Sequence, residues 1–444
     1  MKTVSIATLG CKVNQFESEA LLEALGREGY RTVPFGEKSD ITIINTCTVT
    51  HRADFQSRQM VRRAHRSNSD TLLIVTGCYA QVDPEGLSKI EGVNYLLGNQ
   101  EKNRVLDLLP LMERGELPKV QADDIQNEAS FADISPLSFH HHTRAFLKIQ
   151  DGCNGRCSYC IIPDARGRSR SLLPEKVLQH LRALKQKGYK EVVLTGIHLG
   201  AYGLDLAPSV TLEEILEQVE GDETHSRIRL TSIEPADFSP GLIDLLSRSS
   251  KICPHLHIPI QSGDNEILKR MNRDYDRSFL SDLIQGLHER IRTLSIGADV
   301  IVGFPGETEK RFQNTLELIS SLPLTYLHVF PFSRRKGTPA AQFFPGVEEA
   351  KIKERAGHLR ALGYKKRQAF YQSHLGKRLD VLIEGRQKNG EDWKGLSRNY
   401  IPVFIKDEYG SEGMDWANQE VCAEMVGLGK KGVIGKRVWP GGDR

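Results

Sequence analysis

Three cysteines lie close enough in the sequence to hold one metal cluster. Cys153, Cys157 and Cys160 are spaced CxxxCxxC in the segment DGCNGRCSYC. A loop of this length can place three thiolates at three corners of an iron–sulfur cubane, which leaves one iron open to bind another molecule. Zinc is the alternative, but a structural zinc site takes four ligands, usually from paired CxxC knuckles, and no fourth ligand follows at that spacing. The spacing therefore favours an open 4Fe–4S cluster.

A second set of cysteines is dispersed over the first eighty residues. Cys11, Cys47 and Cys78 each follow a predicted strand, in the segments IATLGC, IINTC and IVTGC. The C-terminal ends of parallel strands share one sheet edge, so these thiols would converge on a second three-thiolate site. A cysteine after a strand is also often just a small buried residue, and the pattern alone leaves that alternative open. Cys253 and Cys422 match neither set and are predicted to be structural.

The composition is that of an ordinary folded chain. Its 444 residues predict roughly three domains, and 39% hydrophobic with 26% charged residues exclude a disordered or collagen-like chain. The net charge is only +3, so a nucleic-acid site would require local clustering of cations. No apolar run approaches the ~18–20 residues of a membrane span, and the N-terminus lacks a signal-peptide pattern. We expect a cytoplasmic protein, with no membrane partner, whose cysteines are reduced.

The first 115 residues alternate short β-branched runs with amphipathic segments, which predicts a parallel sheet with crossover helices. The predicted strands are Thr3–Leu9, Ile41–Asn45 and Leu72–Thr76, and the predicted helices are Glu17–Glu28, Ala53–Arg66 and Pro84–Ile90. Residues 116–143 lose this periodicity and predict a linker. We interpret its three histidines, His140, His141 and His142, as a solvated run without function.

A second alternation, within residues 144–370, predicts the central domain. Six βα units suggest an open, partial barrel, because a full eightfold α/β barrel usually needs more chain. The predicted strands are Phe146–Ile149, Glu191–Thr195, Arg227–Ser232, His255–Ile260, Ile296–Val302 and Tyr326–Phe330. The predicted helices include Pro174–Lys187, Leu212–Val219, Ser278–Arg292 and Lys310–Ser320.

The remaining chain changes character. Residues 351–378 predict a helix with nine Lys or Arg and one acidic residue, Glu354. Residues 371–438 hold short β-rich runs broken by glycines, which predict a small antiparallel β-barrel. These runs are Leu379–Glu384, Tyr400–Ile405 and Val433–Val438. The predicted fold class is therefore α/β, with an N-terminal parallel sheet domain, a partial (βα)6 barrel and a C-terminal β-barrel.

The cysteine loop, with an aromatic residue before its last cysteine and six βα units behind it, resembles the radical S-adenosylmethionine (radical SAM) superfamily. The resemblance implies that S-adenosylmethionine chelates the open iron of the cluster on Cys153, Cys157 and Cys160, and is cleaved to a 5′-deoxyadenosyl radical. It also implies cofactor contacts at the C-terminal ends of the strands, where α/β barrels carry their chemistry. These are Tyr159, Gly196, Ser232, Glu234, Gln261 and Gly303. His198 departs from the family pattern, and its role stays open.

The segments TLGCKVNQFESE, NTCTVT and TGCYAQ, ahead of such a domain, resemble the methylthiotransferase family. The β-rich tail resembles its TRAM domain, an RNA-binding barrel. The resemblance implies two 4Fe–4S clusters, the second of which handles sulfur and is bound by Cys11, Cys47 and Cys78. Since both clusters must act on one substrate carbon, we expect the N-terminal cysteine edge to pack over the mouth of the central barrel.

Three substrate branches of this family are known. Two modify tRNA adenosine 37, carrying either N6-threonylcarbamoyl or N6-isopentenyl, and the third modifies an aspartate of ribosomal protein S12. The stretch LGCKVNQFESE most resembles the threonylcarbamoyl branch. The expected reaction is therefore methylthiolation of C2 of that nucleoside, in the anticodon stem-loop, with an external electron donor and sulfur source. The other two branches, and a non-catalytic iron–sulfur RNA-binding protein, are the alternatives.

Local charge agrees with an RNA partner. Clustered cations that face phosphates give salt-sensitive binding, although a basic run on a helix is usually only a solvated face. The tail from residue 377 onward is nearly balanced, with 12 basic and 11 acidic residues. The candidate cations are Arg52, Arg58, Arg62, Arg63, Arg66, Arg166, Arg168, Arg170, Lys365, Lys366, Arg367, Lys377 and Arg378.

Overall fold

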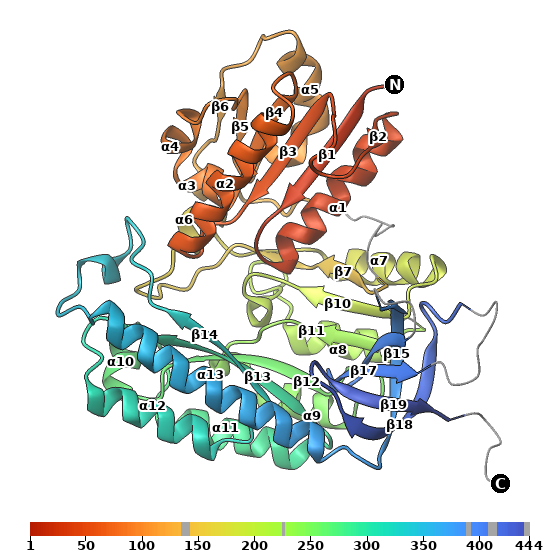
Figure 1. Ribbon diagram of the computed structural model, residues 1–444, viewed down its shortest axis with the longest axis vertical. Coiled ribbons are helices and arrows are strands. Elements are labelled where there is room, and N and C mark those ends of the chain that lie inside the picture. The colour runs from red at the N-terminus through yellow and green to blue at the C-terminus, as the bar shows by residue number, and fades with distance from the viewer. Residues whose placement is uncertain (135–142, 224–226, 388–391, 407–414, 439–444) are drawn as a thin grey trace.

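The computed structural model of the chain describes residues 1–134, 143–223, 227–387, 392–406 and 415–438. An N-terminal α/β unit lies above a central barrel, and a small β-barrel lies at one side of the latter (Figure 1). The three histidines of the predicted linker, at 140–142, lie outside the described residues. In the part of the chain that is described, no helix is long and apolar enough to span a membrane.

The N-terminal unit is built on one six-stranded, all-parallel sheet. Every residue of its strand Ile41–Thr46 is buried, as expected of a strand covered on both faces. The last strand lies in the segment predicted to be a linker, so the sheet extends past residue 115. In spatial order the strands are β2 (Arg31–Thr32), β1 (Thr3–Thr8), β3 (Ile41–Thr46), β4 (Leu72–Gly77), β5 (Tyr95–Leu97) and β6 (Val120–Gln121).

Five helices accompany this sheet, and α2 shows why they form. Thr50 caps its start by accepting a hydrogen bond from the Ala53 N–H at 3.1 Å. Its buried residues recur every three or four positions, so one face packs on the sheet and the arginines face outward. The helices are α1 (Lys12–Arg27), α2 (His51–Ser67), α3 (Cys78–Val82), α4 (Pro84–Ser88) and α5 (Val105–Glu113).

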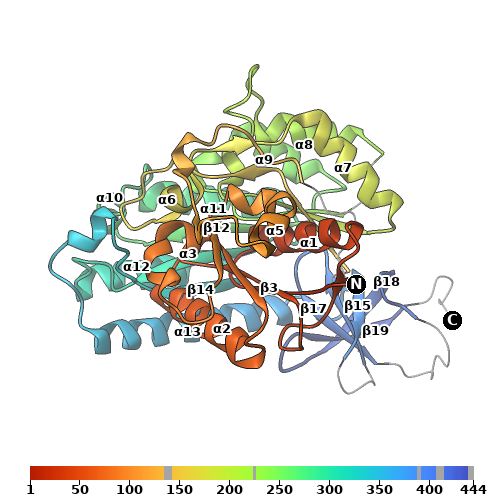
Figure 2. The same cartoon turned by 90° about the horizontal axis from the view of Figure 1, so that it is seen from above.

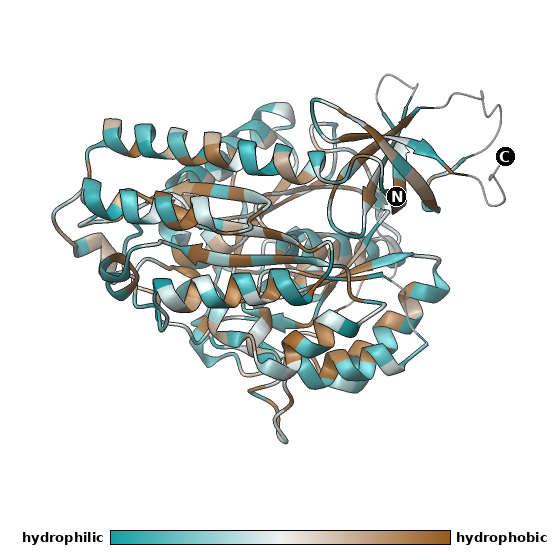
Figure 3. Cartoon of the chain, turned by 90° about the horizontal axis from the view of Figure 1, so that it is seen from below, coloured by the Kyte–Doolittle hydropathy of each residue, from teal (hydrophilic) through white to brown (hydrophobic). Residues whose placement is uncertain are grey.

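The central barrel is six-stranded, parallel and open, which confirms the predicted fold. Two three-stranded sheets, β11–β10–β7 and β12–β13–β14, are joined by bridges from Ile228 to Ile252 and from Ser232 to His257. Residues that line the sheets form one continuous apolar core (Figure 3). The strands are β7 (Ala145–Lys148), β10 (Glu191–Thr195), β11 (Arg227–Leu230), β12 (His255–Gln261), β13 (Ser295–Val302) and β14 (Tyr326–Pro331). A short hairpin, β8 (Gln150–Asp151) with β9 (Arg170–Ser171), flanks the cysteine loop.

Helices follow the barrel strands on the outside, and the barrel's connections also contain the 3₁₀ turns η3 (Leu199–Ala201), η4 (Pro235–Asp237) and η5 (Pro339–Gln342). Two further 3₁₀ turns, η1 (Glu101–Arg104) and η2 (Ile125–Asn127), precede the barrel in the chain. The helices are α6 (Ile162–Arg166), α7 (Pro174–Gln186), α8 (Leu212–Gly221), α9 (Pro240–Arg248), α10 (Asn265–Arg270), α11 (Arg277–Arg290), α12 (Glu309–Ser321) and α13 (Glu349–Gln372). The last of these packs along β14 and ends six residues before the predicted limit of 378, because the left-handed backbone of Gly376 leads directly into the next strand.

The C-terminal unit is a closed five-stranded barrel, as predicted. Trp393 and Trp416 stack in its core with ring centres 5.3 Å apart. It docks against the central barrel through Arg227 and Arg229, whose guanidinium groups donate to backbone carbonyls of the small barrel. Its strands, in order around the barrel, are β15 (Arg378–Arg386), β16 (Asp392–Ser397), β17 (Pro402–Lys406), β19 (Val433–Arg437) and β18 (Glu420–Leu428).

The N-terminal unit sits over the central barrel with its cysteine edge facing downward (Figures 1 and 2). The Arg335 guanidinium reaches up to Asp54 at 2.7 Å and to the Thr48 hydroxyl at 2.7 Å. Ser333 accepts a hydrogen bond from the His51 N–H at 3.0 Å. Helices α3 and α6, each adjoining a cysteine set, pack on each other. The expected packing of the cysteine edge over the barrel is confirmed.

Candidate active site between the two α/β units

The cysteine loop is held by backbone contacts at both ends and in its middle. The Cys153 N–H donates to the Gly167 carbonyl at 3.0 Å, and the Ser158 N–H donates to the Met271 carbonyl at 3.0 Å. Cys153, Cys157 and Cys160 are all partly exposed and interact electrostatically with one another. The structure therefore brings the predicted loop triad together at one accessible place.

The dispersed cysteines converge at the C-terminal ends of β1, β3 and β4. A Cβ built on Gly10 would lie 2.8 Å from the Cys47 Cβ, and Gly10 has φ +101°, so the turn before Cys11 packs directly on Cys47. Cys47 in turn interacts electrostatically with both Cys78 and Cys11. The three strands end in register at one edge, which is why residues 36 and 31 positions apart meet.

Both triads contain thiols that are neutral without a metal. Burial, followed by the neighbouring thiols, raises the pKa of Cys47 to about 12. Burial raises the pKa of Cys160 to about 12 as well. Binding to iron replaces the thiol proton, and thiolates are the ligands of iron–sulfur clusters. Each triad supplies three such ligands and therefore fits a 4Fe–4S cluster with one open iron.

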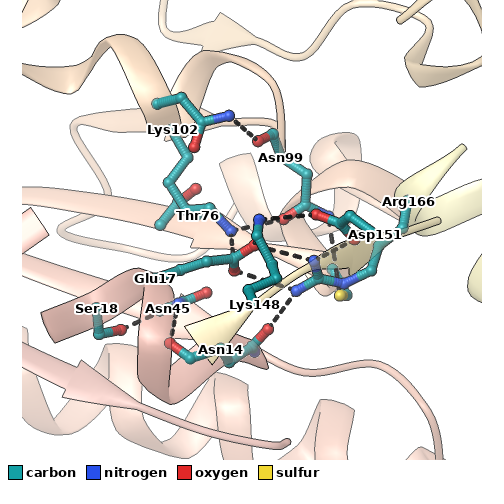
Figure 4. Close-up of polar contacts among 12 residues, drawn as sticks. Asn14, Glu17, Ser18, Asn45, Thr76, Asn99, Lys102, Lys148, Asp151 and Arg166 are labelled. Atoms are coloured by element: carbon teal, nitrogen blue, oxygen red, sulfur yellow. Dashed lines mark hydrogen bonds and ion pairs between the residues drawn. The ribbon is translucent and has the colours of Figure 1, made fainter. Parts of the chain in front are cut away.

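A buried network of charges joins the N-terminal unit to Lys148 and Asp151, which precede the cysteine loop (Figure 4). Glu17 of α1 accepts from Lys102, from Lys148 at 3.1 Å and from Arg166 at 3.0 Å, and Asp151 pairs with Lys148 and Arg166. Burial opposes ionisation of Glu17, but the three cations lower its pKa well below the usual range. The network holds three cations and two carboxylates, which leaves one positive charge beside the thiols.

Arg166 carries that positive charge to the N-terminal triad. Its guanidinium donates to Asn14 at 2.6 Å and interacts with Cys11, Cys47 and Cys78. It stabilises thiolates there and is only 1% exposed, so it cannot contact RNA. The predicted RNA contact by Arg166 is wrong, because the fold buries a charge that sequence alone places in solvent. Arg170 is likewise buried, whereas Arg168 is exposed.

A pocket of about 170 Å³ lies between the N-terminal unit and the barrel rim. Val49 and Thr50, just after Cys47, form one wall, and Ile301 and Phe330 from β13 and β14 form the other. The predicted cofactor contacts Tyr159 and Gln261 both line it, together with Asp299. This pocket reaches from beside the loop triad to the segment that follows the second triad.

Arg273 links the predicted cofactor contacts Glu234 and Tyr159, and the sequence analysis did not identify it. Arg273 pairs with the Glu234 carboxylate and donates to the Tyr159 hydroxyl at 2.6 Å. Ser232 lies with its Oγ 2.9 Å from Nδ1 of His257. Gly303 lies elsewhere: a Cβ built on it would meet Ile352 of α13 at 2.4 Å, and its N–H donates to Glu307 at 2.7 Å. The structure therefore packs the α-carbon of Gly303, which directly follows β13, against α13.

Gly196 and His198 follow β10 beside the loop triad. A Cβ on Gly196 would lie 2.9 Å from Gln150 Oε1, which accepts from the His198 N–H at 2.8 Å. The His198 ring lies 3.7 Å from the Cys153 sulfur and donates to Asp237 at 2.8 Å. Burial opposes its protonation, but Asp237 and Cys153 raise the pKa of His198 to about 10. His198 therefore places a positive charge next to the Cys153 sulfur.

A group of polar side chains on β12, β13 and β14 lies inside the barrel, and the sequence analysis did not predict it. His328 donates to Asp299 at 3.2 Å, and His257 Nε2 lies 3.2 Å from the same carboxylate oxygen. Burial opposes ionisation of Asp299, but the two histidines lower its pKa. Farther along, His255 lies 2.8 Å from the Tyr326 hydroxyl and stacks on Tyr400 of the small barrel, with ring centres 4.0 Å apart.

Lys12, like Arg273, is a candidate site residue that the sequence analysis did not identify. It follows Cys11 as the first residue of α1, is partly exposed, and makes no hydrogen bond or ion pair with any described residue. Its ammonium interacts electrostatically with Arg144, Arg229 and Glu191. A basic residue directly after one of the three dispersed cysteines was the available signal.

Two known families match adjacent parts of the chain. Residues 147–319 match the radical SAM superfamily and contain the loop triad. Residues 3–98 match an uncharacterized protein family, UPF0004, and contain the N-terminal triad. Each family therefore covers one of the two cysteine sets.

Relatives of known activity extend over nearly the whole chain. The threonylcarbamoyladenosine tRNA methylthiotransferase MtaB of Bacillus subtilis is 41% identical over 93% of this chain and 92% of its own. The protein of the same name from Aquifex aeolicus is 40% identical over 90% of this chain and 96% of its own. A tRNA-2-methylthio-N(6)-dimethylallyladenosine synthase of Clostridium botulinum strain Hall is 34% identical over 87% of both chains.

A solved structure agrees with the fold. The radical SAM methyltransferase TsrM of Kitasatospora setae, with cobalamin and a 4Fe–4S cluster bound, matches with a TM-score of 0.58 at 17% identity, over 76% of this chain and 77% of that chain. At this identity the likeness concerns the fold alone. The relatives decide the family, because they are at least 34% identical across both α/β units. This chain therefore belongs to the radical SAM methylthiotransferase family of tRNA-modifying enzymes.

Proposed function

We propose that this enzyme replaces the hydrogen on C2 of N6-threonylcarbamoyladenosine, at position 37 of tRNA, with a methylthio group. The observation that carries the proposal is the meeting of two three-thiol sets at one interface, each able to hold a 4Fe–4S cluster with an open iron. The choice of nucleoside is supported by two relatives named for it, at 40% and 41% identity.

The chain's residues divide the work between two cluster sites. When bound, the cluster on Cys153, Cys157 and Cys160 supplies with S-adenosylmethionine the one-electron chemistry that an unactivated aromatic C–H requires, and the cluster on the N-terminal triad handles the sulfur. The loop thiols lie beside His198, which balances negative charge there. The N-terminal thiols lie beside Arg166, which does the same. An external electron donor and sulfur source complete the reaction.

The lining of the pocket between the triads suits part of S-adenosylmethionine or an adenine base. Tyr159 and Phe330 offer aromatic surface, and Gln261 and Asp299 offer hydrogen-bonding groups. We assign cofactor contacts to Tyr159 and Gln261 in the pocket, with Gly196, Ser232 and Glu234 close by. Gly303, which follows β13, remains in this assignment through its backbone, because its α-carbon packs on α13.

We assign tRNA binding to exposed cations on the N-terminal and C-terminal units. Arg52, Arg62, Arg63 and Arg66 are exposed on α2, and Lys365, Lys377 and Arg378 are exposed at the junction with the small barrel. Phosphates that contact these groups would give binding that weakens with salt. The small barrel then acts as the RNA-binding TRAM domain, and the enzyme meets tRNA in the cytoplasm.

Nucleoside mass spectrometry tests the proposal. The reconstituted enzyme is incubated anaerobically with S-adenosylmethionine, dithionite and tRNA that carries N6-threonylcarbamoyladenosine, and in parallel with tRNA that carries N6-isopentenyladenosine. A methylthio mass gain on the first RNA alone is expected. A gain only on the second would overturn the choice of nucleoside and keep the enzyme class, whereas no gain on either would overturn methylthiolation of tRNA.

A further inference from the structure

Three side chains on neighbouring strands converge inside the central barrel. Asp299 of β13 lies directly opposite His328 of β14 in the strand register, and His257 of β12 lies opposite Gly297, two residues before Asp299. Side chains two residues apart on a strand point to the same face of the sheet, so all three share one face. Because the strands are hydrogen-bonded neighbours, they hold His257, Asp299 and His328 in a fixed arrangement.

The donor atoms of these three side chains are close enough to share one ion. Nε2 of His257 and Nδ1 of His328 each lie 3.2 Å from Oδ1 of Asp299, and one donor atom from each residue lies within 4.8 Å of the other two. Two atoms bound to one zinc ion at about 2.0–2.1 Å, with a tetrahedral angle between them, lie about 3.3–3.4 Å apart. Both separations of 3.2 Å are close to this spacing. The His328 side chain is 54% exposed, so its ring can turn toward an ion.

His257 has a ring nitrogen that the described chain leaves without a partner. Its Nδ1 lies 2.9 Å from the Ser232 hydroxyl, whereas its Nε2 is buried and makes no hydrogen bond with any described residue. His257 as a whole is only 9% exposed, and a buried polar atom without a partner is rare in folded proteins. When Nδ1 donates to Ser232, Nε2 presents a lone pair 3.2 Å from a carboxylate oxygen of Asp299. A cation bound by both atoms would remove the repulsion between them.

The donor set indicates which class of ion fits. Imidazole nitrogen suits zinc, iron and other divalent transition metals, whereas magnesium and calcium take oxygen ligands. Two histidines and one carboxylate are also the protein ligands of several catalytic zinc and non-haem iron sites, which keep a coordination position open. The Ser232 hydroxyl can fix the tautomer and orientation of His257, as the hydrogen-bond partner of a metal-bound histidine does.

Asp299 places this group at the edge of the pocket between the N-terminal unit and the barrel rim. It lines that pocket of about 170 Å³ together with Tyr159 and Phe330. We infer that His257, Asp299 and His328 bind one divalent transition-metal ion of the zinc class, with an open coordination position at this pocket. That position takes water or an oxygen atom of a molecule in the pocket, which the ion would polarise. The site uses none of the six cysteines of the two triads.

Zinc binding by the holoenzyme tests the site. The protein with both iron–sulfur clusters assembled is titrated anaerobically with Zn²⁺ by equilibrium dialysis, and its metals are counted by mass spectrometry. About one zinc is expected per chain in addition to about eight iron atoms. X-ray absorption at the zinc edge should show nitrogen or oxygen neighbours at about 2.0–2.1 Å and no sulfur neighbours at about 2.3 Å.

Two substitutions and a control relate the zinc to these residues. Ser232→Ala keeps all three ligands but removes the partner of His257, and it should weaken zinc binding about 10- to 100-fold. His328→Gln can still hydrogen-bond to Asp299 but lacks a ligand nitrogen, so it should weaken binding further. His288→Gln removes an exposed imidazole from α11 and should leave zinc binding unchanged.

Other results overturn the inference. A holoenzyme that binds no zinc would show that the three side chains form a hydrogen-bonded group only. Sulfur neighbours at about 2.3 Å would place the zinc on cysteines. Equal affinity of His328→Gln and the unsubstituted enzyme would place the zinc elsewhere. The absorption spectrum of the unsubstituted enzyme decides the ligand type even if a variant fails to fold. Since all these measurements are made without tRNA, they are judged separately from methylthiolation.

Discussion

The two cysteine sites are built in opposite ways. Cys153, Cys157 and Cys160 lie on one loop, so a few local hydrogen bonds fix where they lie. Cys11, Cys47 and Cys78 meet only when three parallel strands are paired in register. A site encoded in one loop tolerates distortion elsewhere, whereas a site encoded in a sheet edge depends on the whole domain. Arg166, which follows the cysteine loop, donates hydrogen bonds to Glu17 and Asn14 of the N-terminal unit and so links the two sites.

Removing one cysteine from each site should separate their roles most strongly. Cys153→Ala should reduce 5′-deoxyadenosine formation to background, because the loop then offers two thiols. Cys47→Ala should stop methylthiolation while partly sparing 5′-deoxyadenosine formation. Each variant should fall from about eight to about four iron atoms per chain. Chromatography of both products from anaerobic reactions measures the difference, and normal cofactor cleavage by Cys153→Ala would refute the assignment of the loop site.

Removing the negative charge of Glu17 from the buried network should destabilise the fold around both cysteine sites. Glu17→Gln leaves Lys102, Lys148 and Arg166 buried with less negative charge, which should reduce the free energy of unfolding by about 3–5 kcal/mol at pH 7. The pKa of Glu17 is lowered in the fold, so its contribution is complete above the unfolded value of about 4.3 and is lost as pH falls further. Urea titrations should therefore show the variant approaching the unsubstituted protein only in acid.

The exposed Glu28→Gln, at the end of the same helix, serves as the control and should change the unfolding free energy by less than about 0.5 kcal/mol. A loss of that small size in Glu17→Gln would show that the network does not join the two sites energetically.

The same contrast explains what the sequence could and could not predict. The loop triad and the long strands were predictable, because local spacing and β-branched runs determine them. Short strands such as β6 (Val120–Gln121) were missed because two residues carry no pattern, and pairing with β5 determines them. The charged network was missed because Glu17, Lys102 and Arg166 meet only through tertiary packing, and a charged residue is by default predicted to be exposed.

Gly10→Ala should damage the N-terminal site without removing a thiol. The added Cβ would lie 2.8 Å from the Cys47 Cβ, in a backbone with φ +101°, so Cys47 must move. We expect iron content to fall toward about four atoms per chain, with 5′-deoxyadenosine formation retained. Gly29→Ala is a matched control, because Gly29 has φ +84° and open space around it. It should share the backbone strain of about 1–2 kcal/mol and keep its iron. Equal iron loss in both variants would attribute the effect to backbone strain.

The smallest expected difference concerns the thiols before a cluster is bound. Burial raises the pKa of Cys160 to about 12, so its thiolate fraction should rise about tenfold per pH unit from pH 7 to pH 10. Alkylation by iodoacetamide in cluster-free protein, followed by peptide mass spectrometry, should show this slope at Cys160. Cys47 should show the same slope at a lower overall rate, because it has the same pKa but is buried. Cys422, which is partly exposed and lies outside both sites, serves as the control for the pH dependence of iodoacetamide itself. An alkylation rate at Cys160 that levels off below pH 9 would mean that the pKa of this thiol is not raised. Burial would then not raise the thiol pKa at both sites.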